Sequence, residues 1–106
     1  MKMKTKVRNM TGRTGRKVAN QFIISDCFIE YKTRTGEIMR SQKGNMFQSY
    51  QSNIAFKSVN GHTFLDAEKW DFSVTTGKYR NIFLNETKKE TLKKIKSGEY
   101  ILTDLN

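Results

Sequence analysis

The chain has 106 residues and a mass of 12.4 kDa, with twenty Lys and Arg against ten Asp and Glu and a formal net charge of +10. This length predicts one small domain, which excludes a multidomain enzyme and leaves little room for a large enclosed active site. The longest apolar run, Phe22-Ile23-Ile24, is far shorter than the ~20 residues of a membrane-spanning helix.

Two features indicate a reducing compartment such as the cytosol or nucleoid. No apolar segment follows the N-terminal lysines, so no secretory signal is visible. Cys27 is the single cysteine and has no partner for an internal disulfide.

Most of the excess charge lies near the N-terminus. Residues 1–25 contain no acid, and their basic residues are Lys2, Lys4, Lys6, Arg8, Arg13, Arg16 and Lys17. Because few residues of the segment 1–20 suit a core, we expect a flexible basic arm there, extended or disordered when free. Such an arm can follow a chain of phosphates and release counterions. A solubilising tail is the alternative.

Residues 21–106 are expected to form a single domain that begins with strands. Residues 22–24 and 27–32 have strand composition with a bend at Ser25-Asp26, and residues 34–37 predict a hairpin turn onto 38–40. Residues 41–45 predict a further turn before a strand at 46–50. Asn60-Gly61 predicts a type I′ hairpin between 53–59 and 62–66, with Ile54, Phe56 and Phe64 on one core face.

After Trp70 the hydrophobic period becomes helical. Ser73 and its neighbouring threonines offer N-caps for a helix that runs through Leu84. Thr87-Lys88-Lys89-Glu90 is a capping box, and Gly98 is placed to end the second helix. Residues 100–102 predict a final short strand or an apolar strap. The fold class is therefore α+β: a small antiparallel meander sheet with two short C-terminal helices.

The residue pattern does not favour catalysis. Asp26 and Glu30 would lie ~13 Å apart along one extended strand, too far to share a metal ion. Cys27 lies in an apolar strand, which favours a buried, small hydrophobic side chain over an activated thiolate. The sequence contains one cysteine and one histidine, His62, so a zinc site of the usual kind would need carboxylate ligands as well. We expect no enzymatic activity, no metal and no cofactor.

Nucleic-acid binding has more support. In residues 69–80 aromatic side chains alternate with cations, and a hydroxyl-rich segment precedes a predicted helix N-terminus suited to a phosphate. We therefore add Lys78, Tyr79 and Arg80 to the seven cations of the arm as the predicted nucleic-acid site, for DNA or RNA. Tyr50, Trp70 and Tyr79 are candidates for base stacking. The alternative is that Trp70, Phe72 and Phe83 form the core.

Two motifs carry a family resemblance: F-x-S-Y-x-x-x-I-A at residues 47–55 and W-D-F-S-x-T-T-x-K-Y-R-x-x-F-L at residues 70–84. They resemble an uncharacterised family of small proteins of bacteriophages and mobile elements, over residues 47–105. The resemblance implies a phage or prophage gene expressed in the bacterial cytoplasm, and it supplies no catalytic residues.

The resemblance adds an alternative function. A small phage protein of this kind can bind and inhibit a host or defence protein, or take part in virion assembly. The lysine-rich second helix indicates a solvated surface rather than a membrane contact. Exposed sheet edges would allow a homo-oligomer.

Overall fold

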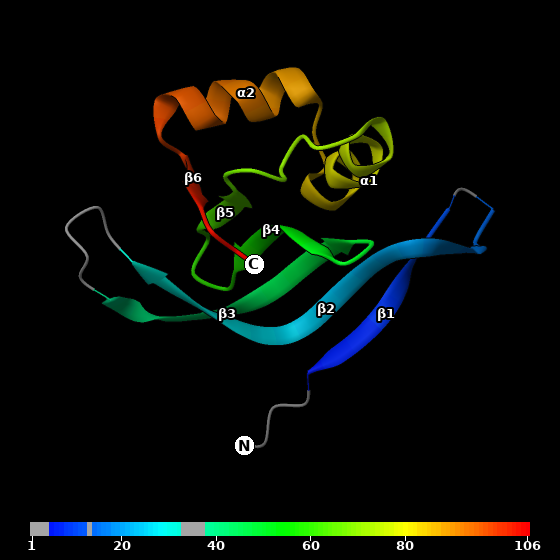
Figure 1. Ribbon diagram of the computed structural model, residues 1–106, viewed down its shortest axis with the longest axis horizontal. Coiled ribbons are helices and arrows are strands. Elements are labelled where there is room, and N and C mark those ends of the chain that lie inside the picture. The colour runs from blue at the N-terminus through cyan, green and yellow to red at the C-terminus, as the bar shows by residue number, and fades with distance from the viewer. Residues whose placement is uncertain (1–4, 13, 33–37) are drawn as a thin grey trace.

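The computed structural model describes residues 5–12, 14–32 and 38–106. In this part of the chain six strands form one sheet in the order β1-β2-β3-β4-β5-β6, with two helices between β5 and β6 along the chain (Figure 1). The elements are β1 (Lys6–Thr11), β2 (Lys17–Lys32), β3 (Ile38–Ser49), β4 (Ser52–Ser58), β5 (Thr63–Asp66), α1 (Val74–Leu84), α2 (Lys88–Ser97) and β6 (Tyr100–Thr103).

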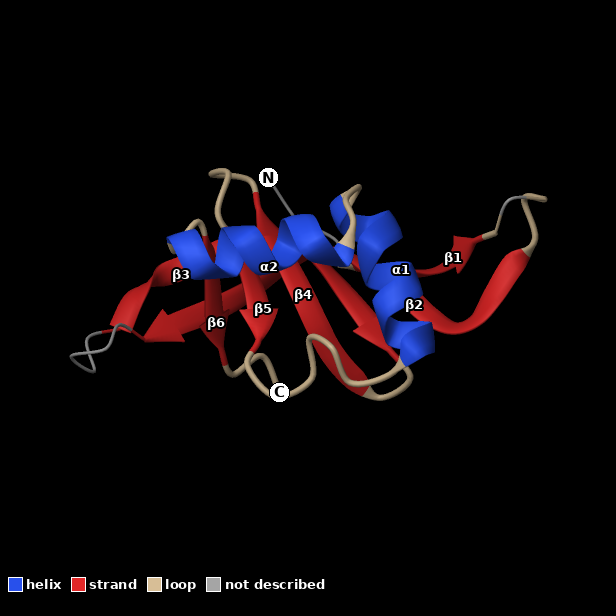
Figure 2. Ribbon diagram, turned by 90° about the horizontal axis from the view of Figure 1, so that it is seen from above, coloured by secondary structure: helices blue, strands red, loops and turns tan. Residues whose placement is uncertain are grey.

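The α+β class is confirmed, but the sheet is mixed. Consecutive strands from β1 to β5 pair antiparallel, whereas β5 and β6 pair parallel, from Thr63 with Tyr100 to Asp66 with Thr103. Seen from above, both helices lie over the same face of the sheet, and the β1–β2 hairpin projects beyond α1 (Figure 2). A parallel pair requires a crossover connection, and the two helices form it.

The N-terminal segment differs from the predicted free arm. β1 pairs with β2, with Lys6 opposite Ser25 and Asn9 opposite Phe22, and Met10 is buried in the core. Backbone pairing and one inward apolar side chain hold this hairpin, while its cations stay exposed. This corrects the prediction of an arm over residues 1–20, because residues 6–11 and 17–20 belong to the sheet. Residues 1–4 and 13 lie outside the described residues.

The predicted bend at Ser25-Asp26 is confirmed as a β-bulge. The register of β2 and β3 shifts between Ile24 and Cys27, and Asp26 has a φ of 55°. The turn predicted at residues 41–45 is wrong, because β3 continues through them. At Gly44 an added Cβ would lie 2.0 Å from the carbonyl oxygen of Lys57, so glycine here permits close approach of two backbones. The predicted turn at residues 34–37 lies outside the described residues.

Asn60-Gly61 joins β4 to β5, but the turn is not type I′. That turn needs a positive φ at both central residues. Gly61 has a φ of 88°, whereas Asn60 does not adopt a positive φ. The loop instead covers residues 59–62, and the hydroxyl of Ser58 accepts hydrogen bonds from the backbone N–H groups of Asn60 and His62, each at 3.2 Å.

Both faces of the sheet bury apolar side chains. The cluster under the helices consists of Met10, Ile23, Phe47, Ile54, Ala55, Leu65, Leu84 and Tyr100. On the opposite face lie Met46, Phe56 and Phe64, with partly buried Ile24, Cys27, Ile29, Ile101 and Leu105 packed against them. The placement of Ile54 with Phe56 is thus corrected: the register shift next to Phe47 leaves Ile54 unpaired and turns it towards the helices.

The helix caps agree with the sequence. Ser73 caps α1, Thr87 and Glu90 form the capping box of α2, and Gly98 ends α2 in the left-handed conformation. The link between the helices is tied to β6 by Glu86, whose side chain is 2% exposed. Its carboxylate accepts hydrogen bonds from Thr91 Oγ1 at 2.5 Å, Tyr100 Oη at 2.5 Å and Lys94 Nζ at 2.8 Å.

Candidate nucleic-acid interface

The β1–β2 hairpin supplies most of the predicted cations that the structure describes. Its turn is closed by hydrogen bonds from Gly12 N–H to the carbonyl of Arg16 and from Gly15 N–H to the carbonyl of Gly12, at 2.9 and 3.0 Å. Gly15 has a φ of 78°, which glycine adopts without strain. The exposed cations of the hairpin are Lys6, Arg8, Arg16 and Lys17. Since residues 1–25 contain no acid, this projection is uniformly positive.

Helix α1 is held against the sheet by hydroxyl groups. The hydroxyls of Ser49 on β3 and Thr76 on α1 are 3.0 Å apart and buried, and Ser73 Oγ accepts the backbone N–H of Thr76 at 3.1 Å. The buried residues of α1 are Thr76, Arg80 and Leu84, spaced four apart. This spacing fixes which side of α1 meets the sheet.

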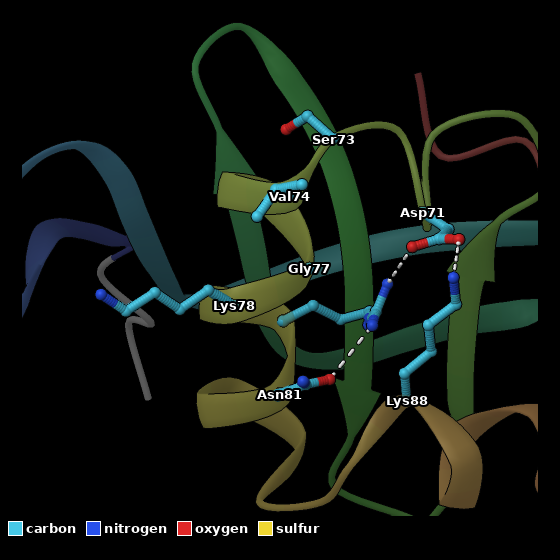
Figure 3. A pocket seen from close by; sticks show the side chains of 8 residues that line it. Asp71, Ser73, Val74, Gly77, Lys78, Asn81 and Lys88 are labelled. Carbon is cyan, nitrogen blue, oxygen red and sulfur yellow. Dashed lines mark hydrogen bonds and ion pairs between the residues drawn. The ribbon is translucent and has the colours of Figure 1, made fainter.

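A cavity of about 730 Å³ lies where the hairpin meets α1, lined by Thr11, Gly12, Lys78, Tyr79 and Ile82. We call it the hairpin groove. Lys78 Nζ is 5.4 Å from the centroid of the Tyr79 ring, a cation–π distance. Figure 3 shows the Lys78 side chain pointing towards the hairpin strands, away from Asp71 and Lys88. The structure thus brings predicted residues Lys78 and Tyr79 next to the predicted arm.

Arg80 is not a surface cation, which corrects its prediction as a phosphate contact. It is 1% exposed, and its guanidinium donates to the backbone oxygen of Trp70 at 2.7 Å, to Asp71 Oδ1 at 3.2 Å and to Asn81 Oδ1 at 3.1 Å. The guanidinium carbon also lies 5.1 Å from the Trp70 ring. Arg80 therefore anchors the segment that precedes α1.

The carboxylate of Asp71 is neutralised by two cations. Lys88 Nζ lies 2.7 Å from Oδ2, opposite the contact with Arg80 (Figure 3). Burial alone would raise the pKa of Asp71, but the hydrogen bonds from Lys88 and Arg80 outweigh it and hold that pKa below its usual value. The adjoining cavity of about 660 Å³ is lined by Asp71 with its two partners Arg80 and Lys88, and also by Lys78, so its lining has more positive than negative charge.

Other predicted residues have distinct surroundings. Lys2, Lys4 and Arg13 lie outside the described residues.

Trp70 and Phe83 pack against the helix-side cluster, as the core interpretation expected, but Phe72 is 49% exposed. Burial raises the pKa of the Cys27 thiol, so the nucleophilic thiolate is disfavoured.

Sequence reasoning missed Thr11, Gly12 and Ile82 as lining residues. Ile82 on α1 is 51% exposed. The buried side of α1 is formed by Thr76, Arg80 and Leu84, and Ile82 lies on a different side of the helix.

Comparison with known proteins gives a family. The model of DUF8033, a family of unknown function, matches residues 5–99. The chain belongs to this family. The matched range includes the β1–β2 hairpin and both helices, so it contains the residues that line the hairpin groove. No curated protein and no solved structure shows significant similarity to the chain. Within the described ranges, neither helix has the length and apolar character needed to cross a bilayer.

Proposed function

We propose that this protein binds nucleic acid without catalysis, mainly through backbone phosphates. The observation that carries the proposal is the hairpin groove, where Lys78 on α1 faces the positively charged β1–β2 hairpin. The structure describes five exposed cations on the hairpin and beside the groove: Lys6, Arg8, Arg16, Lys17 and Lys78. They are distributed over the β1–β2 hairpin and α1, which suits a series of phosphates better than a single anion.

The proposal predicts a steep dependence on salt. If five cations each neutralise a phosphate of a single strand, log K falls with log salt with a slope of about −3.5. Raising the salt from about 50 to about 200 mM then lowers the affinity about 100-fold. The measurement is fluorescence anisotropy with labelled single-stranded and duplex DNA and RNA at several salt concentrations.

A matched pair of triple variants distinguishes binding at a defined surface from a general effect of net charge. One replaces Arg8, Arg16 and Lys17 with Gln; the control replaces Lys89, Lys93 and Lys96 of α2 with Gln. Both remove three exposed cations. We expect the hairpin triple to make the salt slope shallower by about 2 and the α2 triple to leave it nearly unchanged. Equal losses in both would refute a defined surface.

A second candidate function is docking on a host or defence protein. Exposed apolar side chains favour it: Ile82 on α1 is 51% exposed, and Val7 on β1, which is paired with Ile24 and so faces away from the helices, is 63% exposed. Capture of a protein from nuclease-treated bacterial lysate, abolished by Val7→Ser with Ile82→Ser but not by the hairpin triple, would support this function over nucleic-acid binding. We also propose, from the resemblance alone, a phage or mobile-element origin and a place in the bacterial cytoplasm.

A further inference from the structure

We infer that the hairpin groove takes a single strand, with an unstacked base placed against Tyr79 and Ile82; this rests on the proposed function and names its substrate class. Phosphate contacts alone do not explain the lining of the groove. Of its five residues only Lys78 carries a charge. Tyr79, which is partly buried against the helix-side cluster, contributes an aromatic ring to the lining, and Ile82 contributes a half-exposed aliphatic surface. Duplex bases are stacked inside the helix, while single strands present base faces to aromatic side chains.

The size of the groove agrees with this occupant. Its volume of about 730 Å³ falls within the ~300–1,000 Å³ of typical small-ligand sites, the scale of a nucleoside rather than a duplex. Gly12 contributes no side chain to the wall. A Cβ at this position would meet only Val18 Cγ2 at 3.8 Å and the carbonyl oxygen of Arg16 at 3.9 Å, which are ordinary contacts. The position can therefore accept a larger residue at the edge of the groove.

Charge at the groove favours a nucleotide over an uncharged aromatic ligand. Lys78 Nζ, 5.4 Å from the Tyr79 ring, can bind the phosphate of the nucleotide whose base lies on that ring. The nearby carboxylate of Asp71 is bound by Arg80 and Lys88, so it does not offset the positive charge of Lys78. The cations of the hairpin continue the phosphate path beyond Thr11 and Gly12.

The test compares three labelled oligonucleotides of about 12 nucleotides, a length within the usual site sizes of single-strand binders. They are oligo-deoxythymidine, an abasic strand with the same phosphates, and a duplex. One stacked base contributes ~1–3 kcal/mol, so we expect oligo-deoxythymidine to bind at least about fivefold more tightly than the abasic strand. This comparison uses the unmodified protein, so it does not depend on any variant folding.

Variants then locate the base. We expect Tyr79→Leu and Ile82→Ala, each made singly, to lower the ratio of affinities for oligo-deoxythymidine and the abasic strand at least about threefold. The salt slope should stay unchanged. Tyr79→Phe keeps the ring and should keep the preference. Gly12→Leu should weaken oligo-deoxythymidine more than duplex. Lys96→Gln, on α2, is the control and should change none of these ratios.

Two failures are distinguishable. If the abasic strand and oligo-deoxythymidine bind equally, with a steep salt slope that the hairpin triple makes shallower by about 2, the proposed function stands and the single-strand inference is overturned. If none of the three binds at low salt, both are overturned. A base preference that survives Tyr79→Leu and Ile82→Ala together would place the base elsewhere and also refute the inference.

Discussion

Replacing Glu86 with Ala tests the polar cluster that ties the helices to β6. The carboxylate is almost completely buried and accepts three hydrogen bonds, from Thr91, Lys94 and Tyr100. Hydrogen bonds to a charged group contribute about 1.5–3 kcal/mol each. Lys94 can turn to solvent and Thr91 Oγ1 keeps a second acceptor, the Thr87 carbonyl at 3.2 Å, whereas the Tyr100 hydroxyl loses its acceptor. We therefore expect the free energy of unfolding to fall by about 3 kcal/mol.

For a domain of this size each kcal/mol shifts Tm by about 4–8 °C, so Glu86→Ala should lower Tm by about 12–24 °C in a thermal melt followed by circular dichroism. The control is Glu99→Ala, which removes the same charge from an exposed position and should change stability by less than about 0.5 kcal/mol. Equal Tm shifts in the two variants would refute the energetic role of the cluster.

The same cluster predicts how stability depends on pH. Burial alone would raise the pKa of Glu86, but the hydrogen bonds from Lys94, Thr91 and Tyr100 hold it below the ordinary value of 4.5. Its contribution is therefore complete above pH 4.5 and is lost as the pH falls through the lower, folded-state pKa. At high pH, burial and the hydrogen bond to Glu86 raise the pKa of Tyr100 to about 12, so stability should decline as the pH rises from 10 towards 12. Urea titrations across pH should show both slopes flattened in Glu86→Ala.

Two further substitutions test the sheet. Gly44→Ala would place a Cβ 2.0 Å from the Lys57 carbonyl oxygen, so it should cost more than about 3 kcal/mol in urea unfolding; a loss below about 1 kcal/mol would show that β3 and β4 are farther apart than described. Met10→Ala should remove about 2 kcal/mol and speed tryptic cleavage after Arg8, Arg16 and Lys17; if these bonds are already cleaved at once in the unmodified protein, the hairpin is not docked.

The structural features that depend on a few adjacent residues could be predicted from the sequence. The capping box at Thr87, the glycine that ends α2 and the bulge at Ser25-Asp26 each depend on a few adjacent residues and are confirmed. The local sequence around Gly44 predicts a turn, but glycine is needed there because the backbone of Lys57 on β4 lies so close, and no local pattern reveals a contact between strands.

The site was predictable only in part, for the same reason. Charge and aromatic content identified Lys78, Tyr79 and the hairpin cations, but as two unrelated places. Their shared groove depends on Met10 docking the hairpin beside α1. Arg80 was misplaced because a cation in a helix normally faces water, whereas here Asp71, Asn81 and the Trp70 carbonyl replace its hydration.

The parallel pairing of β5 with β6 has a consequence for the order of folding. β1 to β5 can add one after another by closing short loops, each with a small entropic cost. β6 reaches β5 only across residues 67–99, so closing this pair has a larger loop-closure cost than any of the antiparallel pairs. We therefore expect β6 to join the sheet after β1 to β5, and a chain in which β6 has not yet joined presents the edge of β5 to the β6 of another copy.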